Sequence, residues 1–312
     1  MVKNIKNKNI IVAVSGGPDS IFLLSKLVKK KYKIIVAHVN YHFRKESNQE
    51  EELVKKICNE NSFIFERLSV DKKIEKIYSK INNNQEAYAR LIRYDFFKEI
   101  AKKYQTNYLF LGHHKDDFLE TAIMQEKRSN KYLFYGINKK NYYQNLILIR
   151  PFINKYWKEE IIEKLNKAKI DYKIDKSNFS DKYLRNQIRK KLFLLNLKEK
   201  EKMLDYYKKI NSANERKRKK IDKIFKNWRI KDYDVDFFNN QKDLLKENLI
   251  YKYLSTQFID ENISINNNKI KAIILFIKNK RGNKNYRLKE NLFLKIKNQK
   301  LIFLKDNFKI NN

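Results

Sequence analysis

Short apolar runs and stretches with helical spacing alternate along the first half of the chain. The runs predict buried or half-buried strands at residues 9–14, 33–39, 62–68 and 107–111. Apolar residues three or four positions apart predict helices near 19–30, 46–60, 86–104 and 116–126. This order of elements predicts an α/β fold, in which a parallel sheet has helices on both faces and binds ligands at the carboxyl ends of its strands.

The pattern changes beyond about residue 195. Lys, Glu and Arg dominate residues 197–227, which is typical of a solvated helix or a linker. From about residue 235 a helical pattern comes first, and short alternating runs near 286–295 and 299–304 then predict a hairpin or a small sheet. We therefore expect three parts: an α/β domain at 1–195, a charged helical linker at 196–234, and a small α+β domain at 235–312.

The first predicted strand runs into a loop that holds two of the chain's five glycines. Residues 15–20 read Ser-Gly-Gly-Pro-Asp-Ser, and a helical pattern follows them. Glycine tolerates positive φ and lets a ligand approach the backbone, so the pair Gly16 and Gly17 indicates an anion site at a helix N-terminus. The loop is neither a Walker A motif nor a dinucleotide fingerprint. An ordinary strand-to-helix turn, capped by its own Asp or Ser, is the alternative.

Every histidine in the chain comes at the end of one of two predicted strands. His38 and His42 follow one strand, and His113 and His114 follow another. The carboxyl ends of parallel strands meet at one edge of a sheet, so this placement favours a shared site over scattered core positions.

Acidic residues begin the helix that comes after His114. Asp117 and Glu120 lie three residues apart, so they share a helix face one turn from the N-terminus. The pair indicates an anionic pocket for a cation, either Mg²⁺ or an ammonium group. Helix capping is one alternative. A zinc site is another, although adjacent histidines point in different directions and no sulfur ligand supports it.

A third cluster lies on the helix predicted near residues 86–104. Glu86, Arg90, Arg93 and Phe97 form one stripe along it. Salt bridging between Glu86 and Arg90 is the simpler interpretation. Beside a triphosphate, however, such an arginine would neutralise charge during adenylyl transfer.

Composition adds a partner and a compartment to this picture. With 71 Lys and Arg against 36 Asp and Glu, the formal charge is +35, which favours a polyanion such as nucleic acid. The bias of an AT-rich genome toward Lys, Asn and Ile would also raise the charge. The one cysteine, Cys58, excludes an internal disulfide and is typical of a buried apolar residue. No apolar run reaches membrane-spanning length and no signal-peptide core is present, so we expect a cytoplasmic protein without a membrane partner.

Several motifs together resemble those of one enzyme family. The loop at 15–20 resembles that of enzymes that cleave ATP between its α and β phosphates. The full series occurs in the order seen in the tRNA(Ile)-lysidine synthases of the PP-loop ATP pyrophosphatase superfamily, whose fold is adenine nucleotide α-hydrolase-like. It comprises residues 15–20, 38–44, 86–94, 111–121, 150–151, 175–178 and 184–189. These motifs cover roughly residues 9–195.

The resemblance implies a ligase that uses ATP and Mg²⁺. ATP adenylates the wobble cytidine of a tRNA(Ile) with a CAU anticodon, releasing pyrophosphate. Free L-lysine then displaces AMP through its ε-amine and leaves lysidine, which changes the tRNA's specificity from methionine to isoleucine. Whether the chain forms a homodimer is left open.

The resemblance also assigns roles to the matching positions. ATP would lie on Ser15, Gly16, Gly17, Pro18, Asp19 and Ser20, with His38. Asp19 and Asp116 would bind Mg²⁺ and the phosphates, and Asp117 and Glu120 would bind lysine. Arg90 and Arg93 would complete the catalytic set by facing the activated cytidine or phosphate. Further contacts to lysine or tRNA would come from His113, His114, Arg185, Asn186 and Arg189.

Some segments depart from the family's pattern. Tyr41 stands where the family usually has a second histidine, so we expect no essential chemistry there. Residues 126–132 replace a glycine-rich loop that faces the tRNA. Residues 282–289 match the small tRNA-binding domain of shorter members weakly, and from them we expect the 235–312 region to bind the tRNA body.

Other activities fit the residues less well. A tRNA thiolase of the same superfamily would need cysteines near the loop, and Cys58 alone does not provide them. Amide-forming ligases that act on small molecules have no need of so basic a surface. A protein that only binds RNA would have no use for the loop together with the acidic residues at 116–120.

Overall fold

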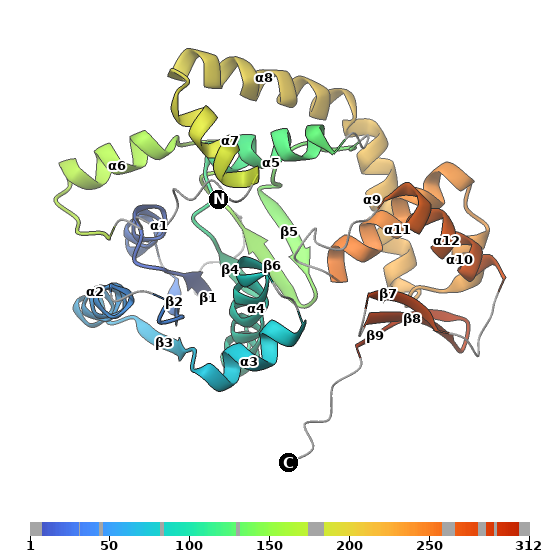
Figure 1. Cartoon of the computed structure of the whole chain (residues 1–312), viewed down its shortest axis with the longest axis horizontal. Coiled ribbons are helices and arrows are strands. Elements are labelled where there is room, and N and C mark those ends of the chain that lie inside the picture. Colours follow the sequence, from blue (N-terminus) through green and yellow to red (C-terminus); the bar gives the residue numbers. More distant parts are fainter. Residues whose placement is uncertain are drawn as a thin grey trace. The chain divides into compact units, whose positions relative to one another are not determined.

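The computed structural model describes residues 8–30, 32–43, 46–81, 84–128, 132–173, 184–257, 266–279, 285–289 and 292–305. Figure 1 labels the helices and strands. The chain divides into two compact units, Met1–Ser212 and Ala213–Asn312. The boundary between the units lies inside the charged segment that composition singles out at 196–234.

A six-stranded sheet forms the centre of the first unit, in the order β3-β2-β1-β4-β6-β5. Its strands are β1 Asn9–Ala13, β2 Lys33–Asn40, β3 Ile64–Ser69, β4 Tyr108–Phe110, β5 Lys140–Tyr143 and β6 Leu146–Ile149. Pairings between the first five strands of that order are parallel, which confirms the prediction of a parallel sheet. The edge hairpin, in which β5 runs antiparallel to β6, was not predicted from the sequence.

Helices cover both faces of this sheet, as predicted (Figure 1). The helices of this unit are α1 Pro18–Val28, α2 Ser47–Glu60, α3 Lys72–Ile81, α4 Gln85–Lys103, α5 Lys115–Lys127, α6 Lys158–Lys167, α7 Leu184–Phe193 and α8 Leu197–Ala213. On one face, Ile10 and Val12 of β1 share a core with residues of α1, α2 and α6. On the other face α4 contacts β1 and β2. A central strand covered on both sides must be apolar throughout, which explains the unbroken run Ile10, Ile11, Val12.

The order of the strands fixes where a ligand can lie. The chain moves outward from β1 to β2 and β3, then returns to the other side of β1 with β4. The connections that leave β1 and β4 therefore lead toward opposite edges of the sheet, and a crevice can form at the carboxyl ends of these two strands. The loops in question are the ones that carry residues 14–17 and 111–114.

The second unit is helical first and ends in a small sheet, in agreement with the sequence. Its helices are α9 Glu215–Ile230, α10 Val235–Asn239, α11 Asp243–Gln257 and α12 Asn267–Lys278. The antiparallel sheet β7-β8-β9 comprises Tyr286–Lys289, Leu292–Lys297 and Lys300–Lys305. Trp228 is fully buried at the core of this unit, with rings of Phe238 and Tyr253 against it.

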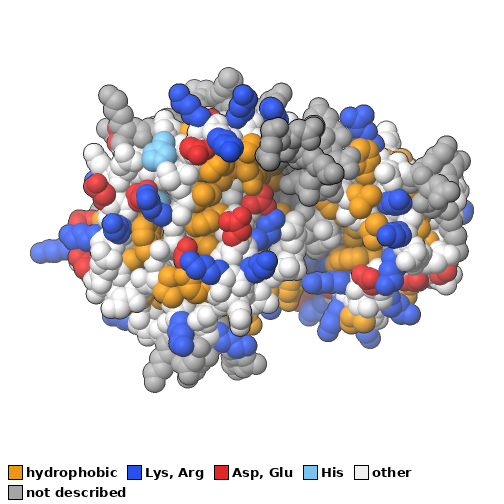
Figure 2. Space-filling model, turned by 90° about the horizontal axis from the view of Figure 1, so that it is seen from below, with side chains coloured by type: hydrophobic (Ala, Val, Ile, Leu, Met, Phe, Trp, Pro, Cys, Tyr) orange, Lys and Arg blue, Asp and Glu red, His pale blue; other side chains and the backbone are white. Residues whose placement is uncertain are grey.

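Charged side chains are spread over the surface. In the face seen in Figure 2, lysines and arginines lie in several small groups with acidic side chains among them, rather than in one continuous patch. Helix α9 exposes a run of basic residues, namely Arg216, Lys217, Lys219, Lys220 and Lys223. Within the described part of the chain, no helix has the length and apolar character needed to cross a membrane. Cys58 is fully buried in the core beside α1, as expected, and burial raises the pKa of its thiol to about 12.

Candidate active site

The loop between β1 and α1 folds into a compact turn around two serines. The Ser20 hydroxyl accepts a hydrogen bond from the Ser15 amide at 3.1 Å and donates one to the Gly17 carbonyl at 2.9 Å. The Gly17 amide donates to the Ser15 hydroxyl at 3.3 Å. Pro18 begins the helix and Gly17 caps it. Both serine hydroxyls thus hold the turn together at a helix N-terminus, where amides and the helix dipole favour an anion.

Gly16 must be a glycine for two independent reasons. Its φ of +91° lies in the region that L side chains rarely adopt. A Cβ there would also lie 3.1 Å from Cβ of Glu50 on α2. The sequence signal of a glycine pair therefore reflects a real backbone requirement at this position.

Gly112, which sequence analysis did not single out, brings the second loop against the first. A Cβ on Gly112 would lie 2.7 Å from the carbonyl oxygen of Asp19 and 3.2 Å from the amide nitrogen of Ser20. These are backbone atoms at the start of α1 and they cannot swing aside. The absence of a side chain at Gly112 lets the loop after β4 pack directly on residues 15–20. We call these residues the nucleotide loop, after the ATP that the resemblance assigns to them. The sequence did offer a signal for this position, because glycine is scarce in a chain that has only five.

A pocket of about 270 Å³ opens where these loops meet. The nucleotide loop contributes Ser15, Gly17, Asp19 and Ser20 to its lining. The loop after β4 and the start of α5 contribute Gly112, His113 and Asp117, and Tyr41, Arg93 and Phe97 line it from β2's end and from α4. Three motifs that are far apart in the sequence therefore surround one space.

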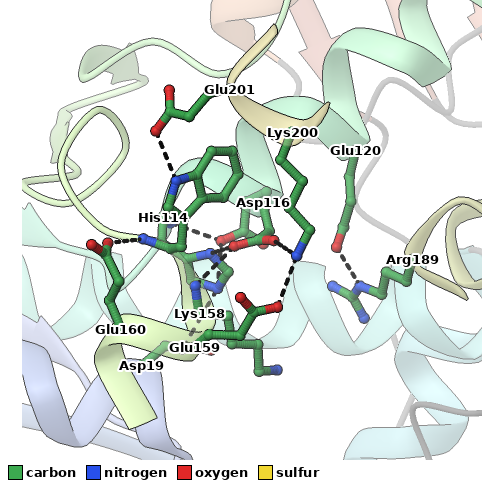
Figure 3. Close-up of polar contacts among 12 residues, drawn as sticks. Asp19, His114, Asp116, Glu120, Lys158, Glu159, Glu160, Arg189, Lys200 and Glu201 are labelled. Atoms are coloured by element: carbon green, nitrogen blue, oxygen red, sulfur yellow. Dashed lines mark hydrogen bonds and ion pairs between the residues drawn. The ribbon is translucent and has the colours of Figure 1, made fainter. Parts of the chain in front are cut away.

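His114 lies beside this pocket, buried among three carboxylates (Figure 3). Its Nε2 is 3.5 Å from Asp19 and 3.4 Å from Asp117, and its Nδ1 is 3.2 Å from Asp116. Burial by itself would lower the pKa of His114. The neighbouring carboxylates of Asp117, Asp19 and Asp116 outweigh burial, so the pKa lies well above its usual value. His114 is therefore an imidazolium at neutral pH. It lies between Asp116 on one side of the ring and Asp19 and Asp117 on the other.

Asp116 points away from the pocket. One of its oxygens accepts the Lys158 amide at the start of α6, at 2.9 Å, and also faces His114. Its other oxygen lies 3.5 Å from the Lys200 ammonium. In this arrangement Asp116 supports His114 from behind.

Asp117 serves the helix and the pocket at once. Its carboxylate accepts the backbone amide of His114 at 2.8 Å, which caps α5. Burial would raise the pKa of Asp117, but the neighbouring His114, His113 and Arg185 lower it strongly. The side chain therefore stays ionised and adds negative charge to the pocket wall.

His113 differs from its neighbour in charge. Burial lowers the pKa of His113 to about 3, and Arg150, Arg90 and Arg185 add to this effect. Its Nδ1 is buried and has no hydrogen-bond partner among the described residues. Adjacent histidines thus present a neutral ring to the pocket at His113 and a charged ring to the carboxylates at His114.

Glu120 is held by two arginines of α7. Its buried carboxylate accepts hydrogen bonds from Arg185 at 3.0 Å and from Arg189 at 2.7 Å. Arg185 also lies 3.8 Å from Glu86 of α4. Asn186 is half-buried on the same helix. This cluster brings together the helices α4, α5 and α7 beside the pocket.

The other predicted site residues line or support the pocket. Arg93 lines it, and Nε of Arg93 is buried without a hydrogen-bond partner among the described residues. The Arg90 guanidinium lies over the Tyr94 ring, 5.0 Å from its centre. His38 lies within β2 and faces the Val14 carbonyl at 2.9 Å, so it supports the nucleotide loop from behind. Burial lowers the pKa of His38. The motif at 175–178 and Arg44 lie outside the described residues.

A divalent cation would find one suitable carboxylate here. Asp19 lines the pocket, and its Oδ1, which lies 3.5 Å from Nε2 of His114, is buried and accepts no hydrogen bond from the described residues. Mg²⁺ takes one or two protein carboxylates and completes its shell with phosphate oxygens and water. No group of three or more His, Cys, Asp or Glu side chains within the described ranges forms a metal cage. The residues therefore fit a cation that is shared with a bound phosphate.

Known proteins resemble the chain closely. A family model described as a PP-loop domain matches residues 1–195. The tRNA(Ile)-lysidine synthase of Malacoplasma penetrans is 41% identical over 298 residues, which are 94% of this chain and 97% of that protein. The tRNA(Ile)-lysidine synthase of Ureaplasma parvum is 37% identical, over 97% of this chain and 90% of that protein.

A solved structure shares the fold. The U34-tRNA thiolase NcsA of Methanococcus maripaludis matches with a TM-score of 0.52 and 15% identity, over 67% of this chain and 73% of that chain. At that identity the likeness concerns the fold alone.

Proposed function

The chain belongs to the tRNA(Ile)-lysidine synthase family, and from this premise we propose how its own residues carry out the reaction. The enzyme uses ATP to form lysidine at the wobble cytidine of tRNA(Ile), and releases AMP and pyrophosphate. Free L-lysine is the amine donor in our proposal, and the anticodon of the substrate is CAU. Because the substrate is a tRNA, we also propose that the enzyme acts in the cytoplasm.

The reaction needs two displacements because a cytosine carbonyl is a poor electrophile. In the first, the carbonyl oxygen attacks the α-phosphorus of ATP, and the bond to pyrophosphate breaks. In the second, the ε-amine of lysine attacks the carbon of that carbonyl, and AMP leaves with the oxygen. The amine gives up its proton as the new C–N bond forms. Activating the base in this way makes AMP a good leaving group.

One observation carries the proposal: the nucleotide loop and the acidic start of α5 share a single pocket. The loop supplies amides at a helix N-terminus for the phosphates. Asp117, which lines the same pocket, supplies a negative charge for an ammonium group. A site for ATP beside a site for an amine is what successive adenylyl transfer and amine attack require, since both act on the same base.

We assign the triphosphate to Ser15, Gly16, Gly17, Pro18 and Ser20 of the loop. Asp19 would hold Mg²⁺, which supplies neutralisation of the phosphate charge when bound. Asp116 would contribute from behind through His114, because both of its oxygens already face protein donors. Arg93 reaches the pocket, so it would stabilise charge that develops on the transferred phosphoryl group.

We assign lysine to Asp117 rather than to Glu120. Asp117 lines the pocket and is ionised, whereas both oxygens of Glu120 accept hydrogen bonds from arginines. Glu120 would fix Arg185 and Arg189 in place, and these arginines would meet the anticodon backbone. Arg is well suited to that contact because its planar guanidinium binds phosphate oxygens in pairs.

A labelling experiment tests the proposal step by step. The wild-type protein is incubated with a CAU-anticodon tRNA transcript and ATP labelled at the α-phosphorus, without lysine. We expect label to stay on the tRNA as an adenylate, and unlabelled lysine added later should release it as AMP. Asp19→Ala should leave the tRNA unlabelled while gel-shift affinity for tRNA stays near wild type.

The control is Ser25→Ala on the same helix. Ser25 donates to the Phe22 carbonyl within α1 and does not line the pocket, so its variant should label tRNA normally. Normal labelling of the tRNA by Asp19→Ala, whether or not its affinity for tRNA changes, would contradict the assignment of the loop.

A further inference from the structure

Lys200 is a buried lysine on a helix whose sequence predicts a solvated surface. It lies near the start of α8, beyond the segment 1–195 that matches the PP-loop domain. Only 3% of its side chain is exposed. Burying an ammonium group is costly unless charged or polar partners compensate, so its contacts reveal what the position is for.

The partners of Lys200 come from two helices of the first unit. Its Nζ lies 2.9 Å from Glu159 on α6 and 3.5 Å from Asp116 on α5. Its ammonium also lies 5.8 Å from the centre of the Trp157 ring. Glu159 is half exposed, whereas Asp116 is mostly buried, so the contact to Asp116 is the one that water screens least.

Asp116 connects Lys200 to the pocket through His114 and Asp19. Figure 3 shows the side chains of Lys200, Asp116 and His114 in sequence, with Asp19 beyond them. Asp116 is 3.2 Å from Nδ1 of His114, and the opposite ring nitrogen is 3.5 Å from Asp19. Asp19 in turn lines the pocket. A continuous chain of charged contacts therefore leads from α8 to the nucleotide loop.

We propose that Lys200 is a positioning residue for adenylyl transfer, which fixes Asp116 so that His114 holds the Asp19 carboxylate in place at the pocket. The proposal rests on the proposed function, because Asp19 matters to the reaction only if ATP binds at the loop. It extends the working site beyond the PP-loop domain to α8. Orientation errors of about 1 Å at a reacting centre cost on the order of 100-fold in rate, so such a contact is worth keeping.

A neighbouring contact offers a matched control. Glu201, the next residue on α8, accepts hydrogen bonds from Lys115 at 2.7 Å and from the Trp157 indole at 2.9 Å. It joins α8 to the same two helices, but within the described residues its ion pair and hydrogen bonds involve neither Asp116 nor His114. A role that consisted only of holding α8 in place would therefore be shared by Lys200 and Glu201.

The test compares Lys200→Met with Glu201→Gln in the full chain. Lysine incorporation into the CAU-anticodon transcript is measured at varied ATP and tRNA. For Lys200→Met we expect kcat to fall about 10- to 100-fold, as for other residues that orient a reacting group, while KM for tRNA stays unchanged. Lys200→Arg should recover most of kcat. Glu201→Gln should keep the wild-type kcat.

A double-mutant cycle separates positioning from packing. If Lys200 acts through Asp116, then Lys200→Met should cause no further loss of kcat in an Asp116→Asn background. Equal losses in Lys200→Met and Glu201→Gln, or additive losses in the double variant, would overturn the proposal. A melting temperature is taken for each variant, and should Lys200→Met fail to fold, the cycle is run with Lys200→Gln. If the wild type itself incorporates no lysine, the proposed function fails instead.

Discussion

At the scale of single residues, the site depends on where side chains are absent as much as on where they are present. Gly112 allows the backbone of one loop to touch the backbone of another, and that contact brings His113 and Asp117 into the same pocket as Asp19. Adjacent histidines then differ in charge, because burial and nearby arginines keep His113 neutral whereas three carboxylates keep His114 protonated. Each of these effects leads to a measurable outcome.

Gly112→Ala should destabilise the protein and impair adenylation. The added Cβ would lie 2.7 Å from the Asp19 carbonyl oxygen, so the two loops must separate. We expect a loss of about 2 kcal/mol in the free energy of unfolding, as for overpacked interiors. Urea unfolding measures it. Gly17→Ala is the control for stability, because its Cβ would meet nothing closer than 3.5 Å. Equal stability of both variants would contradict the close approach at Gly112.

The pH dependence of stability should show a maximum near pH 6.5, where histidines titrate in an unfolded chain. His114 has a raised pKa, so the stability it contributes is complete below pH 6.5 and is lost as the pH rises through its folded pKa. His113 has a lowered pKa of about 3. The unfolded chain therefore binds a proton there that the folded chain does not, and stability falls as the pH drops below 6.5.

His113→Gln tests this assignment. Each unmatched proton changes the free energy of unfolding by about 1.4 kcal/mol per pH unit. Between pH 6.5 and 5 the slope should become shallower in His113→Gln, whereas the limb above pH 6.5 should not change. Urea unfolding at a series of pH values without Mg²⁺ provides the data. An unaltered acid limb would mean that His113 is protonated in the folded protein.

At the scale of elements, the sequence predicted those whose pattern is long or whose turn chemistry is distinctive. Strands β1 to β4 and helices α1, α2, α4 and α5 all lie within a few residues of their predicted ranges. The hairpin β5–β6 was missed because β5 reads Lys-Asn-Tyr-Tyr, without an apolar run, and only two residues separate it from the short apolar run of β6. Lys200 was missed because a lysine in a charged helix carries no sign of burial; only the packing of α8 against α5 and α6 reveals it.

The residues of the site likewise divide into those that the sequence predicted and those whose surroundings it could not show. The sequence pointed to the glycine loop and to the residues at 113–120, since their types and spacing suggest chemistry. It could not show that Asp116 faces Lys158 and Lys200 while Asp117 faces the pocket, because a one-residue step on a helix turns the side chain by about 100° and the surroundings decide the rest.

The contact between α5 and α7 makes a prediction at this scale. Glu120→Gln removes the charge that compensates two arginines, and it should cost about 2 kcal/mol, less than a fully buried pair because 28% and 36% of the Arg185 and Arg189 side chains are exposed. Hydrogen exchange should speed up in α7 while α1 stays protected. Glu163→Gln, which breaks an exposed pair with Lys167, should leave the free energy of unfolding close to that of the wild type. If Glu120→Gln instead raised KM for lysine without faster exchange in α7, Glu120 would bind the amine.

At the scale of the whole molecule, the chain combines a PP-loop unit with a second unit that has its own core. The core around Trp228 is distinct from the core around the central sheet. Basic residues occur in both units, and the exposed run on α9 belongs to the second. A net charge of +35 is suited to a partner with a phosphate backbone.

The affinity for tRNA should therefore fall steeply as salt rises. Each phosphate contact releases close to one counterion, so several contacts give a strong dependence of the dissociation constant on salt concentration. Filter binding between about 50 and 200 mM salt should show a drop of about 1,000-fold or more if six or more phosphates are contacted. A flat response would mean that the excess of lysine reflects genome composition instead of RNA binding.

The most direct test of the account is the identity of the product. The purified protein is incubated with ATP, lysine and a CAU-anticodon tRNA(Ile) transcript, and the digested tRNA is analysed by mass spectrometry. We predict that the wobble cytidine alone is replaced by lysidine, with one AMP and one pyrophosphate released for each lysine joined. An unmodified wobble cytidine, accompanied by ATP cleavage that proceeds equally well without tRNA, would contradict it.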